Sequence, residues 1–386
     1  MIARKLACAS ICLGCLHPAL ADLASDIQSI VAQHQDTTGI PGVIVGVWRG
    51  DTPVTVFTRG FGNVDSSTPI QTTDHTRMGS ITKSFTVTRI MQLAQDGLIS
   101  LDDPISQYVP SVQNGSATLR QLANMTSGIY NYTADTAFAE ALFDDLNREW
   151  TPQQLIDVAN SNAPRFTPGE RWEYSNTNTV LLGMVVEQVT GTSLAEDITT
   201  NLLTPLGLNN TYYPTDSAMP SPYAHGYIEI PEGYEDITQM NPSSSAGAGA
   251  MVGSLEDLRS WAEILATGAN ILSPEFQAVR LQMLPADSII DGPEYDFYGL
   301  GIGEIDGWFG HTGAYLGYQS LALYDPVNDQ TTVILTNLMY GPHIPTDIFR
   351  EISPLLVPEP MHYTVFIGLA GLTVARIKRR KARKAV

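Results

Sequence analysis

Two residues three positions apart, Ser80 and Lys83, have the side chains best suited to chemistry in this sequence. Lys83 is the only lysine between Lys5 and Lys378, so the central part of the chain otherwise relies on arginine for permanent positive charge. Arginine stays protonated in proteins, whereas a lysine loses its proton when burial or neighbouring charges lower its pKa. The pair therefore predicts a serine nucleophile with an amine base beside it.

A helix predicted over Ser80–Gln95 explains how these two side chains meet. Ser80 follows Gly79 and opens the helix, where backbone N–H groups are unpaired and the helix dipole favours developing negative charge. Lys83 is at position i+3 and therefore lies on the same face as Ser80. The alternative interpretation is an ordinary N-cap serine followed by a surface lysine.

Two further polar motifs occur later in the chain. The run Tyr174-Ser175-Asn176 directly precedes a predicted helix, and the run Gly310-His311-Thr312-Gly313-Ala314 is followed by a predicted strand. With Ser-x-x-Lys, in this order and with these gaps, the motifs resemble the serine hydrolases that include class C β-lactamases, family VIII esterases and secreted D-Ala-D-Ala carboxypeptidases. The resemblance covers about 30–340. In the residues of these two motifs, Tyr-Ser-Asn and His-Thr-Gly, the chain is nearer to the carboxypeptidases than to the lactamases, which more often carry Lys-Thr-Gly.

The resemblance assigns roles to the motif residues. Those implied for catalysis through an acyl-enzyme are Ser80, Lys83, Tyr174 and His311. Those implied for the oxyanion hole, through their backbone N–H groups, are Ser80 and Ala314. Those implied for substrate binding are Asn176, Thr312 and Gly313. No metal or other cofactor is implied.

The identity of the general base is left open by the sequence. Tyr174 would remove the Ser80 proton if nearby cations, Lys83 or a protonated His311, lowered the pKa of its phenol. A desolvated Lys83 would serve equally well. In either case Tyr174 is expected to protonate the leaving group later.

Charge narrows the class of partner. Nine of the 21 Lys and Arg residues lie in the two ends of the chain, so residues 22–360 carry 12 cations against 40 acidic residues, a net charge of −28. A protein body this acidic repels nucleic acid and anionic surfaces. The partner that the resemblance implies is a small-molecule or peptide substrate such as an acyl-D-amino acid, an ester or a β-lactam.

One departure from the resemblance bears on the substrate. Carboxypeptidases of this type carry an Arg shortly after a Tyr-Gly-Leu-Gly run, to bind the terminal carboxylate of the substrate. Here that position falls at about Gly303-Glu304, and residues 281–349 contain no Arg or Lys. A free carboxylate would lack a partner there, and Glu304 could repel it.

The N-terminal residues 1–21 have the pattern of a secretory signal peptide cleaved before Asp22. Arg4 and Lys5 precede an apolar run, which ends in Pro18-Ala19-Leu20-Ala21. The three cysteines all lie in this segment, so the mature domain is expected to form no disulfide. A lipoprotein site at Cys15 and a buried N-terminal helix are the alternatives.

Residues 357–386 form a tripartite tail. Val357-Pro358-Glu359-Pro360 leads into an uncharged stretch over Met361–Ala375 and then a basic cluster. This resembles the Pro-Glu-Pro (PEP-CTERM) sorting signals of Gram-negative bacteria, which imply an exosortase-type processing protease as a partner. The stretch is at the lower limit for a transmembrane helix, so a plain membrane anchor is the alternative. Both interpretations predict an exported protein in the periplasm, at the cell surface or in the extracellular matrix.

The order of predicted elements indicates an α/β (α+β) fold. Sheet elements at both ends of the domain over 22–356 enclose a mainly helical stretch, which predicts an antiparallel sheet flanked by helices with an inserted all-α lobe. The α/β lobe is expected to comprise 22–75 and 246–356, and the helical lobe 76–245. This agrees with the β-lactamase/DD-peptidase-like fold that the resemblance implies.

A D-alanyl-D-alanine carboxypeptidase-like serine hydrolase is the function predicted first. An esterase, an amidase or a β-lactamase of the same family is the second possibility. A catalytically silent surface or matrix binding protein is the third, and the intact Ser80, Lys83, Tyr174 and His311 argue against it.

Overall fold

The computed structural model describes residues 17–286, 292–339 and 341–356. Its central element is a nine-stranded sheet in which every neighbouring pair of strands is antiparallel. In spatial order the strands are β3 (Thr68–Pro69), β2 (Thr52–Asn63), β1 (Gly42–Arg49), β13 (Gln330–Thr336), β12 (Tyr318–Asp325), β11 (Trp308–Tyr315), β10 (Gly303–Ile305), β9 (Phe297–Tyr298) and β8 (Leu284–Pro285). The N-terminal hairpin β1–β2 is thus joined to the C-terminal hairpin β12–β13 by the pairing of β1 with β13.

The described helices flank this sheet on both faces. They are α1 (His17–Thr38), α2 (Thr82–Gln95), α3 (Leu119–Ala123), α4 (Thr136–Asp144), α5 (Pro152–Asn160), α6 (Asn176–Thr190), α7 (Leu194–Ile198), α8 (Thr204–Leu206), α9 (Leu255–Thr267), α10 (Pro274–Arg280) and α11 (Ile344–Leu356). Two small sheets, β14 (Leu338–Met339) with β5 (Tyr227–Ile230) and β6 (Gly233–Asp236), and β4 (Thr76–Arg77) with β7 (Val252–Gly253), complete the described elements. The predicted antiparallel sheet flanked by helices is therefore confirmed.

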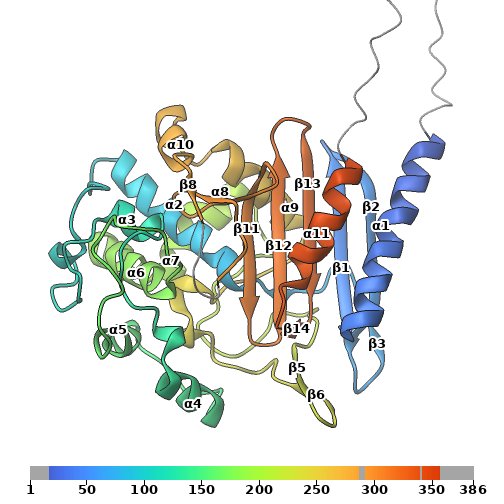
Figure 1. Cartoon of the computed structure of the whole chain (residues 1–386), viewed down its shortest axis with the longest axis horizontal. Coiled ribbons are helices and arrows are strands. Elements are labelled where there is room, and N and C mark those ends of the chain that lie inside the picture. Colours follow the sequence, from blue (N-terminus) through green and yellow to red (C-terminus); the bar gives the residue numbers. More distant parts are fainter. Residues whose placement is uncertain (1–16, 287–291, 340, 357–386) are drawn as a thin grey trace, which may run out of the picture.

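Burial on both faces explains the apolar composition of the central strands. β12 and β13 are buried along their whole length, because α11 packs on one face of the pair and α9 on the other. In Figure 1, α1 lies beside α11 at one side of the molecule, while α2, α3, α5, α6 and α7 gather at the other side, to the left of β11. The apolar core is accordingly divided between the sheet's two faces.

The ends of the chain fall largely outside the described residues. The predicted tail over 357–386 lies wholly outside them, and of the predicted signal peptide only 17–21 are described, as the start of α1. None of the described helices combines the length and the apolar composition needed to cross a membrane.

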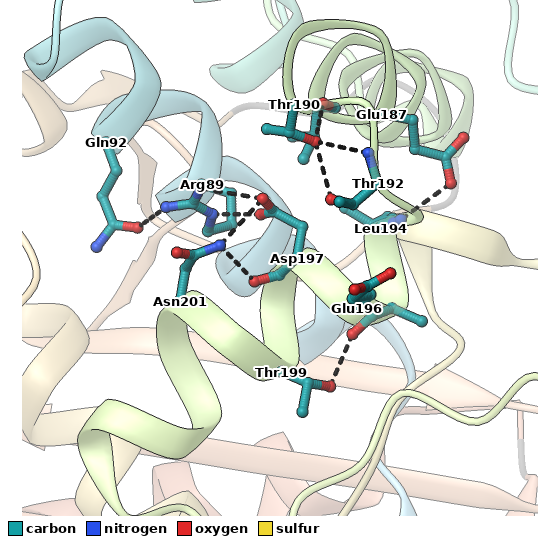
Figure 2. A network of polar contacts seen from close by, with 12 residues as sticks. Arg89, Gln92, Glu187, Thr190, Thr192, Leu194, Glu196, Asp197, Thr199 and Asn201 are labelled. Carbon is teal, nitrogen blue, oxygen red and sulfur yellow. Dashed lines mark hydrogen bonds and ion pairs between the residues drawn. The ribbon is translucent and has the colours of Figure 1, made fainter.

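A buried ion pair fastens α2, the helix that follows Ser80, to α7. Figure 2 shows the Asp197 carboxylate between Arg89 and Asn201. Arg89 Nε and Nη2 both donate to this carboxylate, the second over 3.2 Å, and Asn201 Nδ2 donates to it over 3.1 Å. Both charged side chains are more than nine-tenths buried. Removing one charge would leave the other buried without its counter-ion.

Replacing Arg89 with methionine is therefore expected to lower the free energy of unfolding by about 3–5 kcal/mol. Urea or thermal unfolding measures the change. Arg120→Met is the matched control, because the Arg120–Asp102 pair is solvent-exposed on the aspartate side and should contribute at most about 1 kcal/mol. Equal losses in the two variants would contradict the prediction.

Candidate active site

Gly79 brings the predicted nucleophile against β11. The residues Gly79–Ile81 form a 3₁₀ turn before α2, so the helix begins at Thr82 and not at Ser80 as predicted. Gly79 has a φ of +50°, and a Cβ there would lie 2.9 Å from the backbone N, C and O of Ala314. Only glycine fits so close an approach with a left-handed backbone. The turn thus places Ser80 beside the Ala314 backbone.

Lys83 is fully buried and held by three oxygen atoms. Its Nζ lies 2.9 Å from Ser80 Oγ, 2.6 Å from Asn176 Oδ1 and 2.7 Å from Ala248 O. These oxygens carry no formal charge, so none of them acts as a counter-ion for a buried ammonium, and burial lowers the pKa of Lys83 well below its usual value. The amide and carbonyl oxygens only accept hydrogen bonds, whereas a serine hydroxyl also donates. A neutral Lys83 amine would therefore donate its two hydrogens to Asn176 Oδ1 and Ala248 O and direct its lone pair at the Ser80 hydroxyl.

Asn176 is oriented by its own neighbours. Its Nδ2 donates to Thr133 Oγ1 over 2.9 Å, and its backbone N–H donates to Asn131 Oδ1 over 3.0 Å at the start of α6. These contacts aim Asn176 Oδ1 at Lys83. The structure therefore joins Ser80, Lys83 and Asn176 by hydrogen bonds, although 93 residues separate Lys83 from Asn176.

Tyr174 lies on the other side of the lysine. The centre of its ring is 5.0 Å from Lys83 Nζ. Its hydroxyl is buried without a hydrogen bond of normal geometry within the described part of the chain. Burial, and then the neighbouring Tyr295, raise its pKa well above the usual value, and Ser80 offsets this only in part. The lowered pKa considered from the sequence is therefore not found, and Tyr174 is a neutral phenol.

His311 is a buried, uncharged residue. Burial and the nearby Lys83 lower the pKa of its imidazole to about 3, so the protonated His311 considered from the sequence is wrong. Its Nδ1 lies 2.5 Å from the backbone oxygen of Thr312, which only accepts, so Nδ1 carries the proton. Its Nε2 then accepts from Tyr298 OH over 2.9 Å. Neither nitrogen bonds to Ser80, Lys83 or Tyr174 in the described residues, which fits a positioning role better than a catalytic one.

The backbone of β11 supplies the second predicted oxyanion donor. Successive strand residues direct their N–H groups to opposite edges. Gly313 is paired with Ser320 of β12 and its carbonyl faces the Ser320 hydroxyl. Thr312 N–H points away from β12, to Tyr295 OH at 2.9 Å. Ala314 N–H therefore also points away from β12, at the edge where Gly79 approaches, as an oxyanion hole shared with Ser80 requires.

A pocket of about 290 Å³ opens beside Ser80, and Asn176 and Ala314 also line it. One wall is apolar and comes mainly from α4 and the turn after β11: Phe138, Ala139, Leu142, Phe143, Leu316 and Met339. None of the described residues that line the pocket is charged. Thr312 and Gly313, predicted as substrate-binding residues, do not line it; Gly313 instead packs its Cα against Met78 O.

Glu304 does not reach this pocket. It is nearly buried in β10, and its carboxylate accepts a hydrogen bond from Gly307 N. The predicted repulsion between Glu304 and a substrate is therefore wrong. The other part of the prediction concerned a missing cation: the described residues that line the pocket include no Lys or Arg.

Three residues at the site went unrecognised in the sequence. Tyr295 and Tyr298 bind the two nitrogens of His311. His343 has its Nε2 3.0 Å from Gly313 O. Tyr298 opens the Tyr-Gly-Leu-Gly run, which was a usable signal. No local pattern marks the other two, because their partners are distant in sequence.

The sequence pattern of the β-lactamase family matches residues 27–353. Protein flp of Staphylococcus aureus (strain N315) is 27% identical over 335 residues, or 82% of this chain and 64% of that protein. The chain thus spans less than two thirds of the length of that curated relative. Penicillin-binding protein 4* of Bacillus subtilis (strain 168) is 29% identical over 174 residues, which is 44% of this chain and 38% of that protein.

Solved structures agree with the sequence comparison. A D-stereospecific amidohydrolase from Streptomyces sp. is 31% identical with a TM-score of 0.74, and the match covers 86% of this chain and 97% of that one. The D-amino acid amidase of Ochrobactrum anthropi SV3, solved with L-phenylalanine amide, has a TM-score of 0.76 over 86% of this chain and 99% of that one. Its 23% identity supports the fold alone. From the family match over 27–353 and these similarities, the chain belongs to the β-lactamase family.

Proposed function

We propose that the protein is a serine hydrolase that cleaves amides or esters through an acyl-enzyme on Ser80. The observation that carries this proposal is the buried Lys83 amine, held by Asn176 Oδ1 and Ala248 O and directed at Ser80 Oγ over 2.9 Å. A nucleophile and its base within hydrogen-bond reach, with the base oriented by further groups, is the general arrangement for covalent catalysis. The similarity to the Streptomyces D-stereospecific amidohydrolase adds support.

In the proposed reaction, Ser80 Oγ attacks the carbonyl carbon while its proton passes to Lys83 Nζ. The backbone N–H groups of Ser80 and Ala314 hold the negative oxygen that forms. As the bond to the leaving group breaks, Tyr174 OH gives its proton to the leaving atom and regains one from Lys83. A water molecule then attacks the acyl carbon by the same proton route, and release of the carboxylic acid restores the Ser80 hydroxyl.

The uncharged pocket favours an uncharged substrate. A free carboxylate bound there would lose its hydration without gaining a cation from the described lining, which costs several kcal/mol. Of the functions considered from the sequence, the proposal therefore places the amidase or esterase ahead of the D-Ala-D-Ala carboxypeptidase. The carboxypeptidase remains the second candidate, because the Tyr-Ser-Asn and His-Thr-Gly motifs are nearer to that class in sequence.

The substrate class is tested by comparing kcat/KM for three compounds at fixed pH and salt. A short-chain ester of a chromogenic alcohol and a peptide amide with a blocked C-terminus are expected to exceed a peptide ending in free D-Ala-D-Ala by at least about tenfold, because 1.4 kcal/mol already corresponds to tenfold in rate. Ser80→Ala is the blank. Preference for the free carboxylate would restore the carboxypeptidase. Rates for all three compounds no higher than those of the Ser80→Ala blank would favour a catalytically silent binding protein.

A further inference from the structure

The edge of β11 beside Ser80 has few backbone groups that a substrate could pair with. β10 pairs with β11 as far as Gly303 opposite Gly310. Beyond that point, the N–H groups of Thr312 and Ala314 point to the same edge. An extended peptide pairs with such an edge through the backbone groups that the edge leaves free. Thr312 N–H lies two residues before Ala314, the predicted oxyanion donor. Whether Thr312 N–H is free or already hydrogen-bonded therefore decides whether an extended substrate can pair there.

Tyr295 caps this N–H group. Its hydroxyl accepts from Thr312 N over 2.9 Å and lies 2.9 Å from both Thr312 Oγ1 and His311 Nδ1. Because Thr312 N–H needs an acceptor and Thr312 Oγ1 can accept the Tyr295 proton, the hydroxyl is fully engaged. The backbone position that would bind a carbonyl of an extended substrate is thus occupied by a side chain of the protein itself.

The Tyr295 ring is held firmly in place. A Cβ at Gly303 would lie 2.2 Å from Tyr295 Cε1, so the ring rests directly on the Gly303 backbone. The ring also makes an edge contact with His311 at 5.4 Å between centroids and a tilted contact with Tyr298 at 5.2 Å. Only 5% of Tyr295 is exposed. Moving the ring aside would break several contacts at once.

The Thr312 N–H that Tyr295 caps lies on the leaving-group side of the scissile bond. The leaving atom must face Tyr174, its proposed proton donor. Ring contacts link Tyr174 to Tyr295: Trp172 contacts Tyr174, at 6.4 Å between centroids, and Tyr298, at 5.9 Å, and Tyr298 contacts Tyr295 at 5.2 Å. The pocket lies in the other direction along β11, at Ala314, Tyr315 and Leu316. The acyl group therefore has space, whereas the leaving group departs toward Tyr295.

We infer that Tyr295 is a specificity-determining residue that closes the leaving-group side of the site. The enzyme then releases small uncharged leaving groups, such as ammonia or a short alcohol, and cleaves poorly before a further amino-acid residue. This inference rests on the proposed function, because it concerns the substrate of the same Ser80 site.

The test uses two uncharged substrates with the same aromatic acyl group, a primary amide that releases ammonia and an amide that releases glycinamide. In the wild-type protein kcat/KM for the first is expected to exceed that for the second by at least about 100-fold, and Tyr295→Ala should reduce this ratio at least about tenfold. Tyr295→Phe, which keeps the ring and frees Thr312 N–H, should reduce it about threefold. Tyr298→Phe is the control, because it also removes a buried hydroxyl from His311 but leaves the Thr312 cap intact.

The outcomes separate the inference from the proposed function. A wild-type ratio near one, with turnover that depends on Ser80, would overturn the role of Tyr295 and leave the hydrolase intact. An unchanged ratio in Tyr295→Ala, or in Tyr295→Phe if the alanine variant does not fold, would do the same. If Tyr298→Phe lowers the ratio of the two kcat/KM values as much as Tyr295→Phe does, the effect belongs to the aromatic cluster in general and not to the Tyr295 cap, which would also overturn the inference. No Ser80-dependent turnover of any amide or ester would overturn the proposed function itself.

Discussion

Ser80→Ala is expected to abolish covalent labelling by a fluorophosphonate or a fluorescent penicillin and to lower kcat by about 10⁴-fold or more. Removing the nucleophile of a catalytic unit eliminates the acyl-enzyme, and the residual rate comes only from binding and the oxyanion donors. The fold should persist, because Lys83 keeps its contacts to Asn176 and Ala248. Mass spectrometry of the labelled protein, with unfolding curves for both forms, measures the two effects.

Ser84→Ala is a matched control for this variant. Ser84 lies four residues after Ser80, in the first turn of α2, and is fully buried; its hydroxyl donates to Ile81 O and accepts from Trp261 Nε1. Its loss is expected to lower stability while labelling at Ser80 continues. Labelling of purified Ser80→Ala at another serine would remove Ser80 as the nucleophile.

Lys83→Arg is expected to lower kcat/KM by about 10²–10⁴-fold, the usual contribution of a positioned general base. Arginine stays protonated and cannot accept the Ser80 proton. The sign of the pH dependence follows from the same chemistry. Burial lowers the pKa of Lys83, so wild-type kcat/KM should rise with pH as the ammonium loses its proton, at a pH well below 10.5. At lower pH the protonated amine is inactive.

This rise with pH should vanish in Lys83→Arg. Lys83→Met provides the second variant, because it removes the amine without adding bulk or charge. Tyr174→Phe distinguishes the two possible bases: with Lys83 as base, it should slow release of a poor leaving group such as ammonia more than release of an activated phenol. A Tyr174→Phe variant that fails equally with both substrates, beside a Lys83→Met variant that retains most of its activity, would identify Tyr174 as the base.

Local geometry made part of the site predictable from the sequence. Ser80 and Lys83 are three residues apart at a helix start, and that spacing alone brings their side chains together. Their hydrogen bond at 2.9 Å agrees with this expectation. The same holds for the sheet elements predicted at the two ends of the domain, which pair with each other in the antiparallel sheet.

Other features required the tertiary structure. Whether Lys83 is charged depends on how much water surrounds it and on whether an acid lies near it, and neither property is local. His311 has an ordinary imidazole in the sequence, yet burial beside Lys83 lowers its pKa to about 3. Glu304 suggested repulsion of a substrate, but the turn that follows it binds its carboxylate through Gly307 N.

The sequence by itself predicted Ser80 as the nucleophile, and it determined the placement of Lys83 beside Ser80, the antiparallel architecture and the family resemblance, because these rest on short spacings and on the order of elements and motifs. Only the tertiary structure decided the directions in which the pKa values of Lys83, Tyr174 and His311 shift, the uncharged lining of the pocket among the described residues and the Tyr295 cap on Thr312. Each of these depends on burial and on contacts between distant segments: Lys83 meets Ala248 across 165 residues, and Tyr295 reaches β11 from a separate stretch of chain. Desolvation and long-range contacts are properties of the assembled fold, and no local pattern encodes them.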